Sequence, residues 1–273
     1  MNARLRDSSL FKQLAYASGV WKNASDGSAL EVRDPADGLP LGSVPALSAR
    51  EVVEAIGAAQ QAMAAWNRET AAQRSAILRR WFELITANTD DLAAILTAEQ
   101  GKPLAEARGE VAYGASYIDW FAAEAVRIEG EILNGPSADK RVLVMKEPVG
   151  LCAAITPWNF PIAMITRKVA PALAAGCAML VKPAPQTPFS ALALAELALR
   201  AGLPAGLFSV LTGDASVIGP ELTRSPLIRK LSFTGSTAVG KNLIADSAST
   251  VKRVTMEFCL LYTSDAADDL LCV

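Results

Sequence analysis

Four polar segments in the second half of the chain carry side chains that could do chemistry together. They are Ile155-Thr156-Pro157-Trp158-Asn159-Phe160-Pro161, Val181-Lys182-Pro183-Ala184, Phe233-Thr234-Gly235-Ser236-Thr237 and Val254-Thr255-Met256-Glu257. An amide such as that of Asn159 can donate to an oxyanion, and a carboxylate such as Glu257 can accept a proton. A glycine turn that opens a helix can hold a pyrophosphate. Taken singly, each residue is also compatible with an ordinary turn or a solvated surface charge.

The absence of histidine limits this chemistry. With His 0 in the composition, Ser-His-Asp triads, Cys-His dyads and the common histidine-rich zinc sites are excluded. The cysteines form neither a metal-type cluster nor a disulfide framework, so we predict no metal site and a reducing, cytoplasmic location. Cys152 and Cys177 lie in apolar segments and are interpreted as inert core thiols. We nominate neither them nor Cys259 and Cys272 as a nucleophile.

Composition describes an ordinary globular protein. The 273 residues are 51% hydrophobic and 20% charged, with a net charge of −2. No basic patch indicates a nucleic-acid or membrane partner, so we expect neither. No apolar run reaches the ~18–20 residues that span a bilayer, and the N-terminal residues lack the apolar core of a secretory signal.

The first half of the chain is predicted to contain short strands followed by helices. We expect strands at 18–21 and 30–35, because glycine and proline turns bound them. Capping boxes at Ser48 and Thr70 predict helices that run to Trp66 and past Ile85. A further helix is expected from Asp91 to the break at 101–103, and a long one from 103 towards 128.

From residue 141 the pattern alternates between strand and helix. Predicted strands are 141–147, 151–155, 178–182, 207–211, 229–233 and 251–257, and predicted helices are 161–175, 188–201, 214–223 and 236–246. Short apolar strands alternating with helices predict an α/β fold with a parallel sheet covered on both faces. Such sheets bind ligands at the carboxyl ends of their strands, where the polar segments lie.

These segments, in this order, resemble the aldehyde dehydrogenase superfamily over residues 7 to 257. The resemblance implies the Rossmann-like cofactor-binding domain of that fold, an aldehyde substrate and a homo-oligomer in full-length relatives. It implies that Asn159 stabilises the oxyanion and that Glu257 activates water as a general base, a task suited to a raised carboxylate pKa. It also implies a dinucleotide held by Ile155, Thr156, Pro157, Trp158, Lys182, Ala184, Pro185, Gly213, Gly235 and Ser236.

The cofactor is expected to be NADP, with NAD possible. The lysine that matches Lys182 in the family reaches the adenosine ribose. NAD-preferring relatives often carry a glutamate three residues later, which would repel a 2′-phosphate. Here that position is Pro185, with Gln186 beside it. The site therefore admits NADP.

Arg167 gives the best indication of substrate. The segments 164–168 and 172–177 are similar to the succinate-semialdehyde dehydrogenase branch, as are Glu99-Gln100-Gly101-Lys102-Pro103-Leu104-Ala105-Glu106-Ala107 and residues 186–194. In that branch this arginine binds the distal carboxylate of the substrate, which suits its two parallel donors. Glutarate semialdehyde is an alternative, because one methylene discriminates weakly.

The resemblance ends at Glu257, where the family continues Glu-Leu-Gly-Gly and this chain continues Glu257-Phe258-Cys259. We therefore expect residues 1–140 and 141–257 to form the two parts of the cofactor-binding region, and 258–273 to be an unrelated tail. The catalytic domain with the family's nucleophilic cysteine is expected to be absent. The alternative to an aldehyde dehydrogenase is thus a catalytically inactive, NADP-binding chain.

Overall fold

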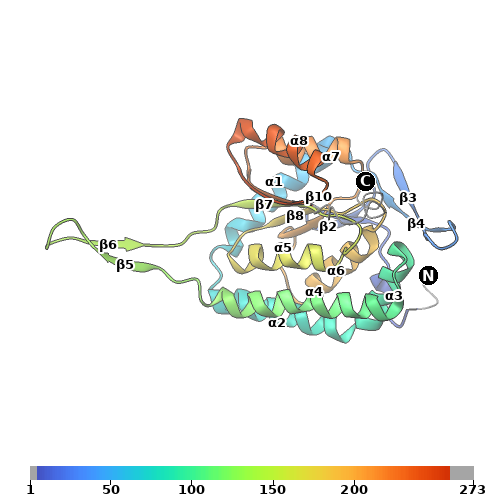
Figure 1. Ribbon diagram of the computed structural model, residues 1–273, viewed down its shortest axis with the longest axis horizontal. Coiled ribbons are helices and arrows are strands. Elements are labelled where there is room, and N and C mark those ends of the chain that lie inside the picture. Colours follow the sequence, from blue (N-terminus) through green and yellow to red (C-terminus); the bar gives the residue numbers. More distant parts are fainter. Residues whose placement is uncertain (1–4, 259–273) are drawn as a thin grey trace, which may run out of the picture.

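A seven-stranded sheet forms the centre of the protein (Figure 1). The computed structural model describes residues 5–258. The sheet order is β11-β10-β7-β8-β9-β1-β2. Its parallel strands are β7 (Leu151–Ile155), β8 (Met179–Lys182), β9 (Phe208–Val210), β10 (Ile228–Gly235) and β11 (Arg253–Phe258). The short strands β1 (Ala15–Ala17) and β2 (Val20–Lys22) extend the sheet in antiparallel orientation beyond β9.

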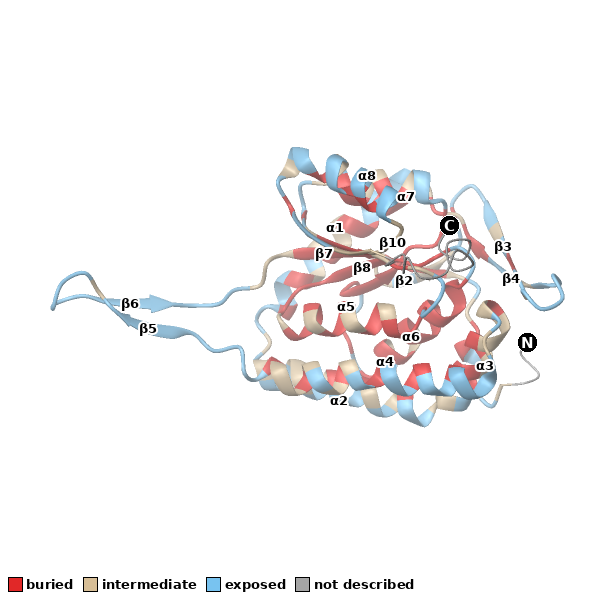
Figure 2. Cartoon of the chain, viewed as in Figure 1, coloured by how far each residue is buried: buried red, intermediate tan, exposed pale blue. Residues whose placement is uncertain are grey.

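Helices cover both faces of the sheet (Figure 1). One face carries α1 (Ala49–Trp66), α7 (Ala215–Arg224) and α8 (Thr237–Ser247). The other carries α5 (Ala163–Ala174) and α6 (Pro188–Arg200), and an outer layer packs on these two helices. That layer consists of α2 (Ala71–Ala87), α3 (Thr89–Gln100) and α4 (Leu104–Ala125). The central strands β7, β8 and β9 and the helices α5 and α6 are therefore largely buried, whereas β11 and β2 at the two sides of the sheet are exposed or half-buried (Figure 2).

The predicted α/β class is confirmed. The sequence also predicted where two helices of the first half begin. Both capping boxes form: Ser48 with Glu51, and Thr70 with Gln73. The predicted helices of the second half agree with α5, α6, α7 and α8 to within two residues at each end. Short 3₁₀ turns, Ser8–Leu10 and Ala248–Thr250, complete the helical elements.

The expectation that 141–147 forms a strand of the parallel sheet is wrong. β6 (Arg141–Val144) pairs antiparallel with β5 (Glu131–Asn134), a strand that we did not predict. This hairpin projects from the body, and every residue of both strands is exposed (Figures 1 and 2). The apolar residues of β6 resemble those of a buried strand, which is why the prediction failed. No helix lies between β6 and β7, so no crossover places β6 in the parallel sheet. A second ribbon, β3 (Ala29–Arg33) with β4 (Pro40–Pro45), also lies outside the main sheet.

Two buried tryptophans tie the helical layers together. The Trp66 indole donates to the carbonyl of Leu173 at 2.9 Å, which joins α1 to α5. The Trp81 indole donates to the carbonyl of Leu194 at 3.1 Å, which joins α2 to α6. Buried indole groups need such partners. The tryptophans therefore help to hold α5 and α6, the two helices that follow the Asn159 and Lys182 segments.

Replacing Trp66 with phenylalanine should lower the free energy of unfolding by about 1–3 kcal/mol, because the Leu173 carbonyl loses its buried donor. Urea unfolding followed by circular dichroism measures this change. The matched control is Trp120→Phe, at a side chain that is 64% exposed, and it should change stability by less than about 0.5 kcal/mol. Equal effects of the two substitutions would contradict the proposed anchoring.

Candidate functional site

The strand register brings the predicted site segments to one edge of the sheet. Ile155 at the end of β7 lies opposite Lys182 at the end of β8. On its other side Ile155 lies opposite Phe233 of β10. The next pair along, Thr234 and Glu257, joins β10 to β11. Parallel strands expose their carboxyl ends at the same edge, which is where open α/β sheets bind ligands.

Asn159 lies in an exposed loop between β7 and α5. Its backbone carbonyl accepts a hydrogen bond from Lys102 Nζ at 2.9 Å. No hydrogen bond within residues 5–258 engages its side-chain amide. Trp158, which precedes it, is 38% exposed. The amide is thus carried at the carboxyl edge by a loop whose backbone is bonded to Lys102, two residues before α4 begins.

Lys182 is buried, which the sequence did not indicate. Only 3% of the residue is exposed, and its Nζ donates to the Pro183 carbonyl at 3.1 Å. Burial lowers the pKa of Lys182 to about 8, against the opposing charge of Asp214. A protonated lysine can donate three hydrogen bonds, and among the described residues Lys182 donates one, to Pro183. Its other donors are available to a ligand. Ala184 is buried beside it, whereas Pro185 is exposed.

Two of the predicted glycines occupy positions that a larger residue could not. Gly213 follows β9 with φ +142, and an added Cβ would lie 3.0 Å from the Leu47 nitrogen. An added Cβ at Gly235 would lie 2.5 Å from the ring of Phe233. Ser236 then caps α8, accepting from the Val239 amide at 3.4 Å. The amides at the start of α8 that Ser236 does not cap are the kind of donors that hold an anion at a helix start.

The residues at this edge fit a dinucleotide. Thr156 is buried, and its hydroxyl has no hydrogen-bond partner among residues 5–258. It is one of several buried hydroxyls in this part of the chain that have no protein partner, and a ligand or water at the sheet edge would complete it. Together with the Lys182 ammonium and the start of α8, it supplies donors for hydroxyls and phosphates along one line of the sheet edge.

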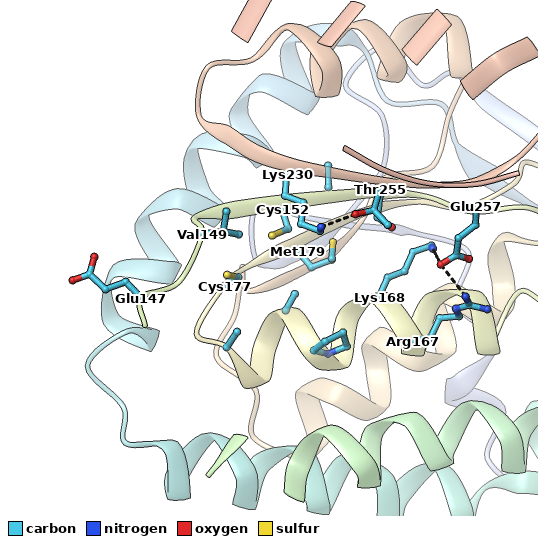
Figure 3. A pocket seen from close by; sticks show the side chains of 15 residues that line it. Glu147, Val149, Cys152, Arg167, Lys168, Cys177, Met179, Lys230, Thr255 and Glu257 are labelled. Atoms are coloured by element: carbon cyan, nitrogen blue, oxygen red, sulfur yellow. Dashed lines mark hydrogen bonds and ion pairs between the residues drawn. The ribbon is translucent and has the colours of Figure 1, made fainter. Parts of the chain in front are cut away.

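Glu257 contacts the residue predicted to bind substrate. Its carboxylate lies 2.8 Å from Arg167 Nη2 and 3.3 Å from Lys168 Nζ, and it accepts from the Thr234 hydroxyl at 2.8 Å. Figure 3 shows both cations reaching from α5 to this carboxylate on β11. The Arg167 guanidinium also lies 6.0 Å from the ring centre of Tyr117 on α4. Arg167 and Glu257 are therefore ion-paired to one another in this state.

The pKa of Glu257 shifts opposite to the direction that suits a general base. Burial raises it, but the Thr234 hydrogen bond and the charges of Lys168 and Arg167 outweigh burial and lower the pKa below its usual value. Lys168 shows the reverse balance, since burial lowers its pKa against the opposing charge of Glu257. At neutral pH the carboxylate is ionised and can accept a proton, but both cations weaken it as a base.

A cavity of about 390 Å³ extends from this ion pair along α5 (Figure 3). Arg167, Lys168 and Glu257 line one end, and Cys152 and Cys177 line the other. Both cysteines are buried, as predicted for core thiols. They lie near the starts of β7 and β8, away from the carboxyl edge. Cys259 and Cys272 lie outside the described residues.

Several residues of the site were not found from the sequence. Lys168 and Thr234 lie beside predicted residues, but their contacts depend on how α5 faces β11. Lys102 and Glu110 lie far from Asn159 in the chain; Lys102 falls within the segment 99–107 quoted for its resemblance, and Glu110 lies just beyond it. In the described part of the chain no group of three or more acidic, cysteine or histidine residues could hold a metal. None of the described helices combines the length and apolarity needed to cross a bilayer.

A mostly parallel sheet with helices on both faces and polar groups along its carboxyl edge is the architecture of nucleotide-binding α/β proteins. The model of the aldehyde dehydrogenase family matches residues 21–259, and the chain belongs to this family.

Within this family the chain is similar to semialdehyde dehydrogenases. The chain is 58% identical to the NADP(+) succinate-semialdehyde dehydrogenase GabD of Escherichia coli K12, over 93% of this chain and 53% of that protein. It is 56% identical to a glutarate-semialdehyde dehydrogenase of Pseudomonas aeruginosa, with the same coverage. The crystal structure of a Burkholderia pseudomallei succinate-semialdehyde dehydrogenase superposes with a TM-score of 0.92 at 60% identity, covering 93% and 53%. The chain thus spans about half the length of these relatives.

The ion pair predicts a pH-dependent contribution to stability. Because the folded pKa of Glu257 lies below the value of about 4.3 in unfolded chains, its contribution is present above that pH and is lost as pH falls through the folded value. Glu257→Gln should therefore destabilise the protein at pH 7 and pH 5, and the difference from wild type should shrink as the pH falls below about 4. Urea midpoints at pH 7, 5 and 3 measure it. The control Glu129→Gln removes an exposed carboxylate that forms no ion pair among residues 5–258, and it should leave the urea midpoint at pH 7 unchanged.

Proposed function

We propose that the chain forms the cofactor-binding part of an NADP-dependent succinate-semialdehyde dehydrogenase. The observation that carries this proposal is the meeting of Arg167 with Glu257 at the sheet edge that also presents Lys182 and Asn159. In this division of the chain, residues 141–257 would supply the parallel strands β7 to β11. Residues 1–140 would supply the antiparallel strands β1 and β2 at one side of the sheet and the helices α1 to α4.

NADP is proposed to lie along the carboxyl edge, where it accepts a hydride from the substrate when bound. Lys182 would donate to the adenosine ribose or its 2′-phosphate, and the amides at Gly235 and Ser236 would face the pyrophosphate. The Thr156 hydroxyl, which has no partner among residues 5–258, would form a hydrogen bond with the same ligand. Pro185 adds no negative charge beside Lys182, which supports NADP over NAD. The printed name of the Escherichia coli relative, which specifies NADP(+), points the same way.

Asn159 and Glu257 would act on the aldehyde carbon. The Asn159 amide would donate to the oxygen that gains charge when a thiolate adds, a contribution typically of about 3 kcal/mol. Glu257 would take a proton from the water that later releases the acid. Cys152 and Cys177 are buried away from this edge, so the thiolate is proposed to come from the part of the relatives that the chain does not match.

Arg167 would select a substrate with a distal carboxylate. A guanidinium binds a carboxylate through two parallel bonds, and here it already holds one, that of Glu257. A bound substrate carboxylate would replace Glu257 on Arg167. The exchange would free Glu257 from one cation and move its pKa upward, towards the range that suits a base. Substrate binding and base strength would then be linked.

A second candidate substrate is glutarate semialdehyde, supported by the 56% identity to the Pseudomonas aeruginosa enzyme. The two substrates differ by one methylene, which pockets distinguish weakly. The alternative to an active enzyme is a chain that binds NADP without turnover. It is supported by the absence of a cysteine at the carboxyl edge among residues 5–258.

Cofactor binding should be linked to proton uptake at pH 8. There Lys182, with a pKa of about 8, is about half protonated; a bound phosphate or hydroxyl would restore its ordinary pKa, so NADP should take up about 0.5 proton. Calorimetric titration in buffers of different ionisation enthalpy measures this number. Lys182→Met should abolish the uptake and weaken binding, whereas Lys146→Met, at an exposed lysine of the hairpin segment, should change neither. Binding without proton uptake would separate Lys182 from the cofactor, and no binding would overturn the cofactor proposal.

A chimera tests the reaction. Residues 1–258 are fused to the unmatched second half of the Escherichia coli relative, and NADPH formation is followed with succinate and glutarate semialdehydes. Asn159→Ala should lower kcat by about 10²–10³. Arg167→Met should raise KM for either semialdehyde about tenfold or more, with a much smaller effect on butanal, which has no carboxylate. Turnover of butanal as efficient as that of succinate semialdehyde would rule out the proposed substrate class.

A further inference from the structure

We propose that Lys102 and Glu110 are positioning residues that hold the Asn159 loop in place from the outer helical layer. This inference rests on the proposed function, because it concerns how the Asn159 amide is presented to the reacting oxygen. Neither residue reaches a bound substrate or cofactor in the scheme above. They act through the backbone of the loop and the start of α5.

Glu110 completes the start of α5. The residue before that helix, Ile162, has no side chain that could cap it. Instead Glu110 Oε1, from α4, accepts from the Ile162 amide at 2.8 Å and from the Ala163 amide at 3.2 Å. Glu110 is 3% exposed, and its charge faces the positive end of the helix. The carboxylate therefore fixes the point where the loop ends and α5 begins.

Close approach between α4 and α5 makes this contact possible. Gly114 lies one turn after Glu110 on α4, and an added Cβ there would lie 2.7 Å from the Ile162 side chain. Gly101 ends α3 with φ +89 and an added Cβ would lie 2.8 Å from Pro35, so the chain turns there as only glycine readily allows. That turn places Lys102 beside the first residues of α4.

Lys102 connects Glu110 to the loop itself. Its Nζ lies 2.5 Å from Glu110 Oε2 and 2.9 Å from the Asn159 carbonyl, and it is 4.1 Å from the centre of the Phe160 ring. The lysine side chain is 9% exposed and that of Glu110 is 1% exposed, so solvent screens the pair weakly. One ammonium group thus holds the carbonyl of Asn159 and the ring of the residue that follows.

The loop depends on this contact between its two fixed ends. At one end the Thr156 amide donates to the Lys182 carbonyl at 3.1 Å, and at the other the Ile162 amide donates to Glu110. Among residues 5–258, Lys102 provides the one side-chain hydrogen bond to positions 157–161. The Phe160 carbonyl also accepts from the Met164 amide at 2.9 Å, so without Lys102 the Asn159 peptide is the part of the loop left free to rotate. Such a rotation would move the amide without unfolding the protein.

The first test observes Asn159 in the chain without any need for turnover. The protein has seven asparagines, so ¹⁵N-asparagine labelling gives few side-chain amide signals, and Asn159→Ala identifies the one of interest. Lys102→Met should shift the Asn159 signal towards its position in a flexible peptide, while the other amide signals stay in place. Lys102→Arg, which keeps the charge and a donor, should restore most of the wild-type position. An Asn159 signal unmoved in Lys102→Met would overturn the proposal.

Glu99→Gln is the matched control for Glu110→Gln. Glu99 is also a buried carboxylate that accepts two backbone amides, those of Phe189 and Ser190 at the start of α6, at 2.7 and 2.8 Å. It is bonded to α6 and not to the Asn159 loop. We expect Glu110→Gln to move the Asn159 signal and Glu99→Gln to leave it. If Glu110→Gln fails to fold, the two Lys102 variants still decide the proposal.

The second test uses the chimera and separates this proposal from the proposed function. Lys102→Met should lower kcat with succinate semialdehyde by about tenfold or more, but by no more than the about 10²–10³ expected for complete loss of an oxyanion donor. KM for NADP should change less than twofold, and Lys102→Arg should recover activity. An Asn159 signal that moves while Asn159→Ala retains full turnover would overturn the catalytic role of Asn159 and leave the positioning intact. A signal that stays while Asn159→Ala is inactive would do the reverse.

Discussion

Unpaired amides at the starts of α5 and α6 are the constraint on which the site depends. Every α-helix begins with N–H groups that have no partner within the helix, and neither of these two is capped by its own first residues. Glu110 meets the need at α5, and Glu99 meets it at α6. Both glutamates come from one short stretch that includes the end of α3 and the start of α4. The two helices that follow the Asn159 and Lys182 segments are therefore held by the same part of the chain.

The two buried glutamates differ in how the unfavourable desolvation of a carboxylate is offset. Glu110 is paired with the ammonium of Lys102, so its charge is compensated. Glu99 has no cation within salt-bridge distance among the described residues, and burial raises its pKa to about 8 against the opposing hydrogen bonds from α6. A buried carboxylate without a partner cation is expected to keep its proton near neutral pH. The pairing at Glu110 requires Lys102, and so brings a cation to the loop of Asn159.

Local sequence signals were sufficient for most of the sheet and its helices. Ser48, Thr70 and the alternation of apolar runs with helical periods gave the elements of the body, because these signals act within a few residues. The 141–147 segment was misplaced for the same reason: its composition is that of a strand, but its partner, β5, is set by the turn between them. Asn159, Lys182 and Glu257 could be placed at strand ends from the sequence. Whether each is buried, and what it contacts, could not be predicted, because both depend on segments far away in the chain, such as α4, which packs on α5.

The pair formed by Arg167 and Glu257 shows why contacts of this kind escape a sequence argument. Each residue has a role of its own in the proposed reaction, and nothing in the chain between them indicates that they meet. In the structure one guanidinium and one buried ammonium face a single carboxylate, which leaves a net positive charge at that end of the cavity. A second carboxylate is the ligand that this balance favours. If it takes Arg167, Glu257 keeps Lys168 and Thr234 but loses its shorter ion pair, while the desolvation that raises its pKa remains. The basicity of Glu257 then depends on what occupies Arg167, so a substrate without a distal carboxylate would meet a weaker base as well as a weaker binding site.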